Sequence, residues 1–261
     1  MVDAINQYDV NRMKMLIRLK ANVNGKCSDG QTLLYKAICR ESVHGVQCLL
    51  DYNAAIDQSN QRAPSSFMMA VERGSPAMVQ LLIRGKASVH ERPNVENTPM
   101  QCAIRHGRND ILKVLIDAKA PLHAEGRRAP PLIYAFDHGS IDTMRVLIDA
   151  KASPDEANWR GGRTPLIEAA IFGALAIVEM LLDAKANVDL QDSDGSTALV
   201  EAVENGNRRT VEALLRANAD LEIADANQRT PLLVAAEVDR KTIARLLIAA
   251  NAALDAYDGK E

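Results

Sequence analysis

Aromatic side chains are scarce in this chain. Of its 261 residues, 3% are Phe, Trp or Tyr, although 47% are hydrophobic. Strands of sandwiches and barrels are usually rich in aromatic and β-branched residues, whereas a core of Ala, Leu, Ile and Val suits closely packed helices. The chain is also long enough to bury a sizeable core. The composition therefore favours an all-α fold.

Long apolar runs are also lacking. Charged residues interrupt the first 18 residues, so no secretory signal is expected there. No uncharged apolar stretch approaches the roughly 18 residues that a membrane-spanning helix needs. We therefore expect no membrane insertion and a cytoplasmic or nuclear location.

Recognisable catalytic and metal-binding motifs are missing. The chain has no phosphate-binding glycine loop, no His-Glu-x-x-His and no Ser, His and Asp grouping in a known context. The four cysteines lack the spacing of metal ligands and are expected to be reduced and inert rather than redox-active. They are Cys27, Cys39, Cys48 and Cys102. We expect neither an enzyme nor a cofactor.

The charges are unevenly distributed along the chain. Residues 1–130 carry 18 Lys and Arg against 12 Asp and Glu, whereas residues 131–261 carry 13 against 22. Such a dipolar chain can orient an asymmetric partner by long-range attraction, although salt screens exposed charges beyond about 8 Å.

What the sequence does have is one unit repeated with a period of 32 to 34 residues. Each unit opens with a Thr-Pro-Leu-like stretch, as in "TPLIEAAIFG" at 164–173, with an alanine five residues after the first position. The first positions are Thr32, Ser65, Thr98, Pro130, Thr164, Thr197 and Thr230. A second apolar segment follows and closes on another alanine, at Ala21, Ala54, Ala87, Ala120, Ala152, Ala186, Ala219 and Ala252.

This pattern resembles the ankyrin repeat along essentially the whole chain. The resemblance implies an ankyrin-repeat solenoid, in which each unit has a β-hairpin finger and two antiparallel helices. A unit cannot hide its apolar stripe alone, so its stability comes from its neighbours. We expect a single domain over 1–261, with a partial repeat at 1–28 that keeps the second helix. Full repeats are expected at about 29–61, 62–94, 95–126, 127–160, 161–193, 194–226 and 227–261.

Helix termini follow the family pattern at one end and depart from it at the other. The Thr or Ser of each opening is expected to cap the first helix, and Pro99, Pro131, Pro165 and Pro231 suit its first position. The family's histidine in that helix is absent. Its glycine after the second helix is replaced by Lys or Asn, at Lys20, Asn53, Lys86, Lys119, Lys151, Lys185, Asn218 and Asn251. Because Lys tolerates a left-handed cap poorly, we expect these ends to be strained or differently capped.

The resemblance places the binding residues at the finger tips and in the last turn of each first helix, which line the concave face. These positions predict a partner-binding set. It comprises Arg40, Arg62, Arg73, Arg105, His106, Arg127, Arg128, His138, Trp159, Arg160, Arg163, Ile171 and Phe172. His106 and His138 occupy matching positions of adjacent repeats, but without a third ligand no metal site is expected.

The finger "NWRGGR" at 158–163 contains the only tryptophan. Its interval from Ala152 to Thr164 is 12 residues, where most fingers have 11, and two glycines allow it to bend. Trp159 near Ile171 and Phe172, with arginines around it, has the composition of an interface hot spot. Alternatively, Trp159 folds over Phe172 and covers a local gap.

Arginine is enriched at the free positions of the first five repeats, where few acids are found. One interpretation is a solvated charged face. The other is a surface for an acidic, extended segment with an apolar anchor, since arginine pairs bidentately with carboxylates and phosphates.

The leading hypothesis is a scaffold or adaptor that binds another protein. A nucleic-acid binder is the alternative, but the pI near 6.0 and the single tryptophan make it unlikely. An inhibitor or assembly chaperone that docks on an enzyme is a further alternative. The last helix is rich in alanine, so the chain is expected to be a monomer or to associate weakly end to end.

Overall fold

The structure is a computed structural model, and it describes residues 1–56, 65–90, 98–124 and 128–254. Two of the predicted binding residues, Arg62 and Arg127, lie outside these ranges. The chain divides into two compact units, Met1–Pro121 and Leu122–Glu261. The boundary falls near the end of the predicted repeat 95–126.

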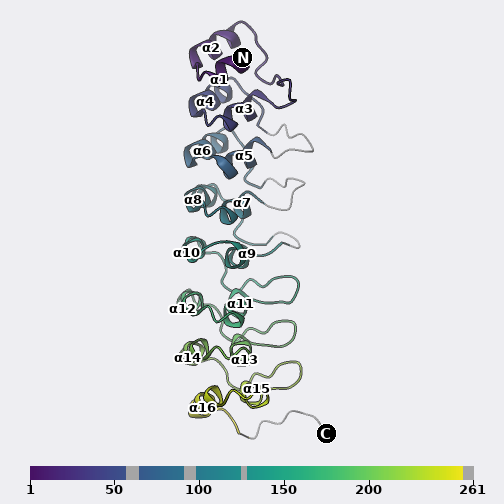
Figure 1. Ribbon diagram of the computed structural model, residues 1–261, viewed down its shortest axis with the longest axis vertical. Helices are drawn as coiled ribbons and strands as arrows, with labels where there is room; N and C mark the ends of the chain where they lie inside the picture. Colours follow the sequence, from purple (N-terminus) through teal and green to yellow (C-terminus); the bar gives the residue numbers. More distant parts are fainter. Residues whose placement is uncertain (57–64, 91–97, 125–127, 255–261) are drawn as a thin grey trace. The chain divides into compact units, whose positions relative to one another are not determined.

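The first unit is a stack of four helix pairs (Figure 1). Its helices are α1 (Val2–Asn6), α2 (Val10–Arg18), α3 (Leu33–Cys39), α4 (Val43–Asp51), α5 (Ser66–Arg73), α6 (Pro76–Arg84), α7 (Pro99–Arg105) and α8 (Asn109–Asp117). The first helices pack in the order α1, α3, α5 and α7, and the second helices form a parallel row. The N-terminal segment thus has a short first helix, α1, which the sequence analysis did not expect; Ala4 and Ile5 anchor it because both are fully buried.

The second unit repeats this plan with four further pairs. Its helices are α9 (Pro131–His138), α10 (Ile141–Asp149), α11 (Pro165–Ile171), α12 (Leu175–Asp183), α13 (Ala198–Glu204), α14 (Arg208–Arg216), α15 (Pro231–Glu237) and α16 (Lys241–Ala249). Here too the first helices pack on one another in chain order, and so do α12, α14 and α16. No helix among the described residues has both the length and the apolar character to cross a membrane.

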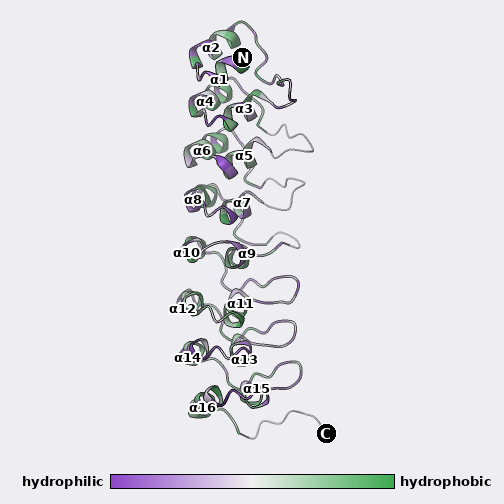
Figure 2. Ribbon diagram, in the orientation of Figure 1, coloured by the Kyte–Doolittle hydropathy of each residue, from purple (hydrophilic) through white to green (hydrophobic). Residues whose placement is uncertain are grey.

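Apolar side chains lie between the two helix rows of each unit, where the ribbon is green in Figure 2. The recurring alanine of the first helix is almost fully buried in every repeat, for example at Ala37, Ala169 and Ala235. A methyl group at this position lets neighbouring first helices approach closely, so a larger side chain would overpack the contact.

The predicted caps are confirmed at the start of the first helices. Thr164 Oγ1, for example, accepts a hydrogen bond from the backbone N–H of Ile167 at 3.3 Å. The same bond is made at Thr32, Ser65, Thr98, Thr197 and Thr230. Pro130 has no side-chain donor or acceptor, so α9 begins without a side-chain cap.

The predicted strain at the ends of the second helices is confirmed. Lys185 adopts the left-handed conformation, with φ of 66°. Its N–H donates to Leu182 O, and the N–H of Ala186 donates to Leu181 O, which is the Schellman arrangement. Positive φ also occurs at each of the other Lys and Asn positions predicted, from Lys20 to Asn251. The backbone N–H of the closing alanine completes this cap.

The fingers differ from the predicted β-hairpins. Within the described ranges they contain isolated bridges, Lys26 with Thr32 and Gln191 with Thr197, and no longer strands. Each finger turns back after too few residues to form a ladder of strand hydrogen bonds. Side-chain hydrogen bonds close the turn instead. In the finger of Asp192, the Oδ1 atom accepts hydrogen bonds from the N–H groups of Asp194 and Ser196.

Candidate protein-interaction site

The finger at 158–163 is built around Asn158. Its N–H donates to Arg163 O at 2.8 Å, and its Oδ1 accepts from the N–H groups of Gly161 and Arg163. Its amide Nδ2 donates to Glu168 Oε1 on α11 at 3.2 Å. One side chain therefore fixes both the closure of the turn and its position on the helix behind it.

Comparison with the regular fingers locates the extra residue. In the next two fingers Asp192 N–H donates to Ser196 O, and Asp225 N–H donates to Arg229 O, four residues on. In the Asn158 finger the matching bond reaches five residues on. Adjacent fingers are linked by a bond from the N–H of Ser193 to Gly161 O, and the same link joins Ala226 to Asp194. Gly161 thus matches Asp194, and the extra residue lies at Trp159–Arg160.

Trp159 is half exposed, with 50% of its surface accessible, and the Arg160 guanidinium carbon lies 5.1 Å from its ring centroid. An arginine over an indole face is a cation–π arrangement. The regular fingers have one residue at the position where this finger has both Trp159 and Arg160. The predicted longer finger is confirmed, and its tryptophan is half exposed.

Phe172 follows α11 and is 70% exposed. Its ring lies 5.6 Å from the ring of Phe136, on the neighbouring helix α9, at an interplanar angle of 46°. Phe136 was not among the predicted residues; its position in the last turn of a first helix could have indicated it. Ile171 is partly buried, and its carbonyl accepts a hydrogen bond from Asn207 Nδ2.

Arg163 is oriented toward the next finger. Its Nε lies 3.6 Å from Asp192 Oδ2, and only 1% of the Asp192 side chain is accessible. This distance is that of an ion pair but is too long for a hydrogen bond, and Oδ2 accepts no hydrogen bond among the described residues. Arg163 therefore takes part in an ion pair between neighbouring fingers, which was not predicted from the sequence.

A complete arginine–aspartate pair lies within the finger of Asp225, where Arg229 occupies the position that Ser196 holds in the finger of Asp192. Arg229 Nε donates to Asp225 Oδ2 at 2.7 Å, and a second guanidinium nitrogen lies 2.6 Å from the same oxygen. Another nitrogen of Arg229 donates to Glu237 Oε2 at 3.2 Å. Burial alone would raise the pKa of Asp225, but the hydrogen bonds from Arg229 outweigh it and the pKa is lowered.

Acidic side chains recur on the first helices behind the long finger. Glu168 and Glu201 occupy the same position of α11 and α13, which pack together. Burial raises the pKa of both, Arg163 opposes the shift, and the charge of Asp192 adds to it. Burial also raises the pKa of Asp137, at the end of α9. The surface behind the long finger is thus rich in acids, although its fingers carry arginine.

Sequence reasoning did not select Asp192, Glu168 or Glu201. A signal was present, since Asp192 and Asp225 recur 33 residues apart, and so do Glu168 and Glu201. Residues that recur at the repeat period were interpreted as packing residues, and no contact between adjacent fingers was predicted.

In the first unit, the arginines at the ends of the first helices lie in one row. Arg40 caps α3, Arg73 ends α5 and Arg105 ends α7, and these helices pack in this order. All three side chains are exposed, and none has an ion pair with another described residue. A cation at a helix C-terminus also interacts favourably with the helix dipole.

The two predicted histidines are each held on their own helix. His106 Nδ1 lies 2.9 Å from Cys102 O, and the His138 ring stacks on Tyr134 with centroids 4.3 Å apart. Among the described residues, no group of three or more His, Cys, Asp or Glu side chains is arranged to hold a metal ion. Burial raises the pKa of the Cys102 thiol to about 11, so this cysteine is a poor nucleophile at neutral pH.

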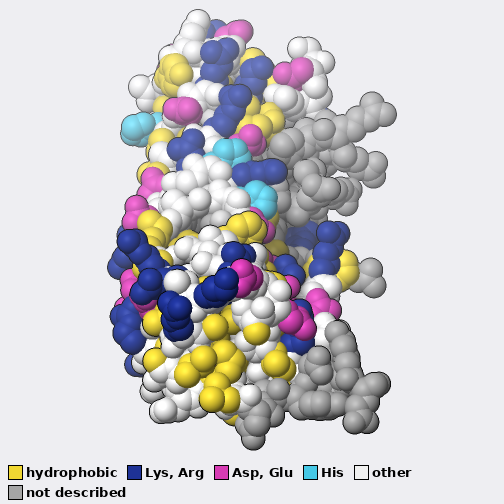
Figure 3. Space-filling model, turned by 60° about the horizontal axis from the view of Figure 1, so that its bottom comes forward, with side chains coloured by type: hydrophobic (Ala, Val, Ile, Leu, Met, Phe, Trp, Pro, Cys, Tyr) yellow, Lys and Arg dark blue, Asp and Glu magenta, His cyan; other side chains and the backbone are white. Residues whose placement is uncertain are grey.

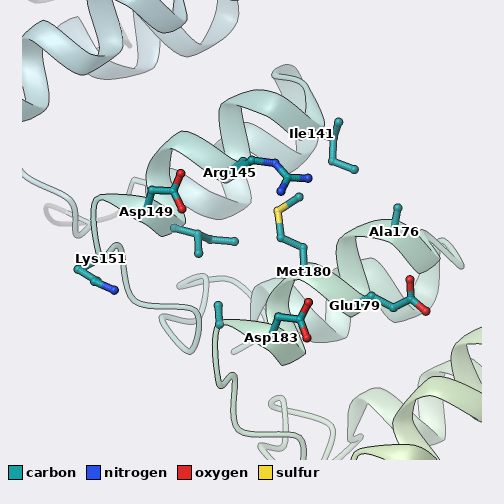
Figure 4. A pocket seen from close by; sticks show the side chains of 10 residues that line it. Ile141, Arg145, Asp149, Lys151, Ala176, Glu179, Met180 and Asp183 are labelled. Carbon is teal, nitrogen blue, oxygen red and sulfur yellow. The ribbon is translucent and has the colours of Figure 1, made fainter.

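The second unit has two other surface features. An open groove of about 560 Å³ lies between α10 and α12, and Figure 4 shows Arg145 and Met180 facing each other across it. Its rim carries charges of both signs, at Asp149, Lys151 and Asp183. This mixed lining does not define a ligand.

The second surface is the end of the unit at α15 and α16, where hydrophobic side chains gather in Figure 3. Ile248 and Leu254 are exposed there, at 46% and 76%. This apolar end is consistent with weak association end to end, which stays a prediction.

Arg128, the remaining predicted residue, is partly buried, and its Nη1 has no hydrogen-bond partner among the described residues.

Comparison with known proteins agrees with this architecture. A family model of ankyrin repeats in three copies matches residues 1–92, 67–158, 125–192 and 166–258. The structure is similar to the crystal structure of the ankyrin repeat domain of Bcl-3, which is described as a unique member of the IkappaB protein family. The two are 28% identical, the match covers 82% of this chain and 99% of the other, and the TM-score is 0.73. The chain belongs to the ankyrin repeat family.

Proposed function

We propose that this protein is an interaction scaffold that holds a segment of a partner protein against the long finger and the adjoining ends of α9 and α11. Ankyrin repeats generally mediate protein–protein interaction, and proteins of this family are typically not enzymes. The likeness to a member of the IkappaB protein family supports the same kind of role.

The observation that carries the proposal is the inserted, half-exposed Trp159. A finger can close without this residue, as the fingers of Asp192 and Asp225 do. An indole that is not required for closure and is held on a turn fixed by Asn158 loses little conformational entropy on binding. Phe172 and Phe136 provide a second apolar surface on the helix side.

These features match those of an interface hot spot. Tryptophan and arginine are enriched among residues whose truncation costs about 2 kcal/mol or more of binding free energy. Trp159 and Arg160 are adjacent and in contact, so the finger offers both. The exposed arginines at the ends of α3, α5 and α7 would suit an acidic stretch of a partner, as the sequence predicts.

The proposal is tested by comparing protein recovered from cell extract by the wild type, Trp159→Ala, Phe172→Ala and Ile141→Ala. Ile141 is an exposed apolar residue of the same unit that lies on the α10–α12 groove, so it is the matched control. We expect each partner's affinity to fall at least about tenfold with Trp159→Ala, which corresponds to roughly 1.4 kcal/mol, and not with Ile141→Ala. Equal recovery by wild type and Trp159→Ala would remove the site.

A further inference from the structure

The first helices of the first unit end in a row of cations. Counted from the capping Thr or Ser, Arg40 and Arg73 both lie eight residues on, at the ends of α3 and α5. In the next repeat His106 holds this position, and Arg105, the last residue of α7, comes directly before it. The three helices pack on one another in chain order, so their ends lie side by side. We refer to Arg40, Arg73 and Arg105 as the arginine row.

The arginine row is unpaired within the part of the chain that the structure describes. All three side chains are exposed, and none forms an ion pair or a side-chain hydrogen bond with another described residue. Two acids are its neighbours along the chain, Glu41 and Glu72, and neither pairs with it. Lys36 on α3 shows the alternative, because its Nζ lies 3.3 Å from Asp29 Oδ2. The charges of the row are therefore available to acidic groups of another molecule.

Helix packing sets the spacing of the row. Packed helices lie about 8 to 10 Å apart, so the row presents one cation at each such step. A polyproline II segment has three residues per turn and rises about 3.1 Å per residue, so side chains on one side of it recur about every 9 Å. A β-strand repeats its same-side side chains about every 6.6 Å and does not match. The row therefore fits a polyproline II segment with an acidic residue at every third position.

We propose that the arginine row binds a polyproline II segment of the partner in which every third residue is Asp or Glu. Each guanidinium then meets one carboxylate, with which arginine forms charge-assisted, bidentate hydrogen bonds. This inference rests on the proposed function and specifies the partner's chemistry at the first unit. It goes beyond a general attraction for acidic chains, because it fixes the register and the conformation of the bound segment.

The test measures binding of labelled peptides to the full chain by fluorescence anisotropy at low salt. One peptide repeats Glu-Pro-Pro three times, and its isomer has the same composition with the three Glu contiguous. A control variant removes as many exposed cations from the second helices of the same unit as the test variant removes from the row. The proteins are the wild type, Arg40→Gln/Arg73→Gln/Arg105→Gln and the control Arg18→Gln/Arg84→Gln/Lys113→Gln.

We expect the Glu-Pro-Pro peptide to bind the wild type about fivefold more tightly than its isomer, because only its carboxylates match the row. Its affinity should fall at least about tenfold, or roughly 1.4 kcal/mol, when the row is removed, a loss that three exposed ion pairs of ordinary strength supply. The control variant should lose less than about threefold, because only long-range attraction changes. The isomer should be weakened about equally by both variants.

Equal affinity of the wild type for the two peptides, or equal losses in the two variants, would reject the inference and leave only nonspecific attraction. Absence of binding to either peptide would also reject it. The proposed function is judged separately, by the recovery of partners with Trp159→Ala. Because the peptides lack an apolar anchor, Trp159→Ala should bind them as the wild type does.

Discussion

Two fingers of the second unit carry an arginine immediately before the threonine that caps the next helix, and they use it differently. Arg229 is satisfied by Asp225 and Glu237 at hydrogen-bond distances. Arg163 is 38% accessible and stands 3.6 Å from Asp192. The long finger, with its inserted tryptophan, thus has the less complete ion pair, whereas the regular finger is closed on itself. The loose pair joins the long finger to the next finger, whereas Arg229 and Asp225 belong to the same finger.

The largest effect should come from removing the charge of the complete pair. Asp225→Asn keeps the acceptor for the backbone N–H groups but leaves Arg229 without its buried partner, so we expect the free energy of unfolding to fall by about 3 kcal/mol. Asp192→Asn should cost less than about 1 kcal/mol, because its pairing is already loose. Urea unfolding at pH 7 measures both. Equal losses would show that the two pairs do not differ.

The difference in free energy of unfolding between wild type and Asp225→Asn also has a defined pH dependence. Because its pKa is lowered in the folded chain, the stabilisation is present above the ordinary aspartate pKa and is lost as pH falls through the folded value. The gap between wild type and Asp225→Asn should therefore narrow in acid.

Substitution of the turn glycines should have the next largest effect on stability, and the loss should differ between the two fingers. Gly195 and Gly162 both have positive φ, of 72° and 64°, so alanine is strained at either. A Cβ at Gly195 would also lie 2.8 Å from the backbone nitrogen of Ala226, whereas at Gly162 its nearest atom is Ser193 Oγ, at 3.0 Å. We expect losses of about 2 kcal/mol for Gly195→Ala and about 1 kcal/mol for Gly162→Ala. The reverse order in thermal unfolding would contradict the packing of adjacent fingers.

Converting Asn158 to the residue of the regular fingers tests why it is an amide. Asn158→Asp keeps the Oδ1 acceptor but replaces the donor to Glu168 with a carboxylate that repels it. We expect a loss of about 1 kcal/mol in the free energy of unfolding at pH 7, which shrinks when Glu168 is protonated. Asn158→Asp with Glu168→Gln should recover most of this loss, and failure to recover it would rule out the contact.

The smallest effect concerns the two glutamates. Burial raises their pKa values, so their ionisation disfavours folding, and stability falls as pH rises from the ordinary glutamate pKa through the raised values. Glu168→Gln/Glu201→Gln should therefore be more stable than wild type at pH 7, by less than about 1 kcal/mol, with the gain vanishing in acid. Thermal unfolding between pH 4 and pH 7 checks the sign, and a gain that grows in acid would reverse the assignment.

The repeat made most of the fold predictable. Helix starts follow from Thr or Ser and Pro, whose capping chemistry is local, and the lysines after the second helices adopt the expected strained conformation. The β-hairpin fingers are reduced to single antiparallel bridges in the described ranges, where side chains such as Asp192 satisfy the turn in place of a longer strand ladder.

The site was predictable only in part. The length of the finger indicated Trp159 as a binding residue, and the position at the end of the first helix indicated Phe172. The state of Arg163 could not be predicted, because it depends on which finger its side chain reaches across to. The repeat period indicates that Arg163 occupies an exposed position. The carboxylate that it faces, Asp192, comes from the neighbouring repeat.

The most direct test is a chain with a finger of regular length, made by deleting Trp159 and measured for both stability and partner binding. Because the insertion is not needed for closure, we predict a free energy of unfolding within about 1 kcal/mol of wild type and at least about tenfold weaker binding. Marked destabilisation with unchanged binding would contradict the account and make the tryptophan a structural residue.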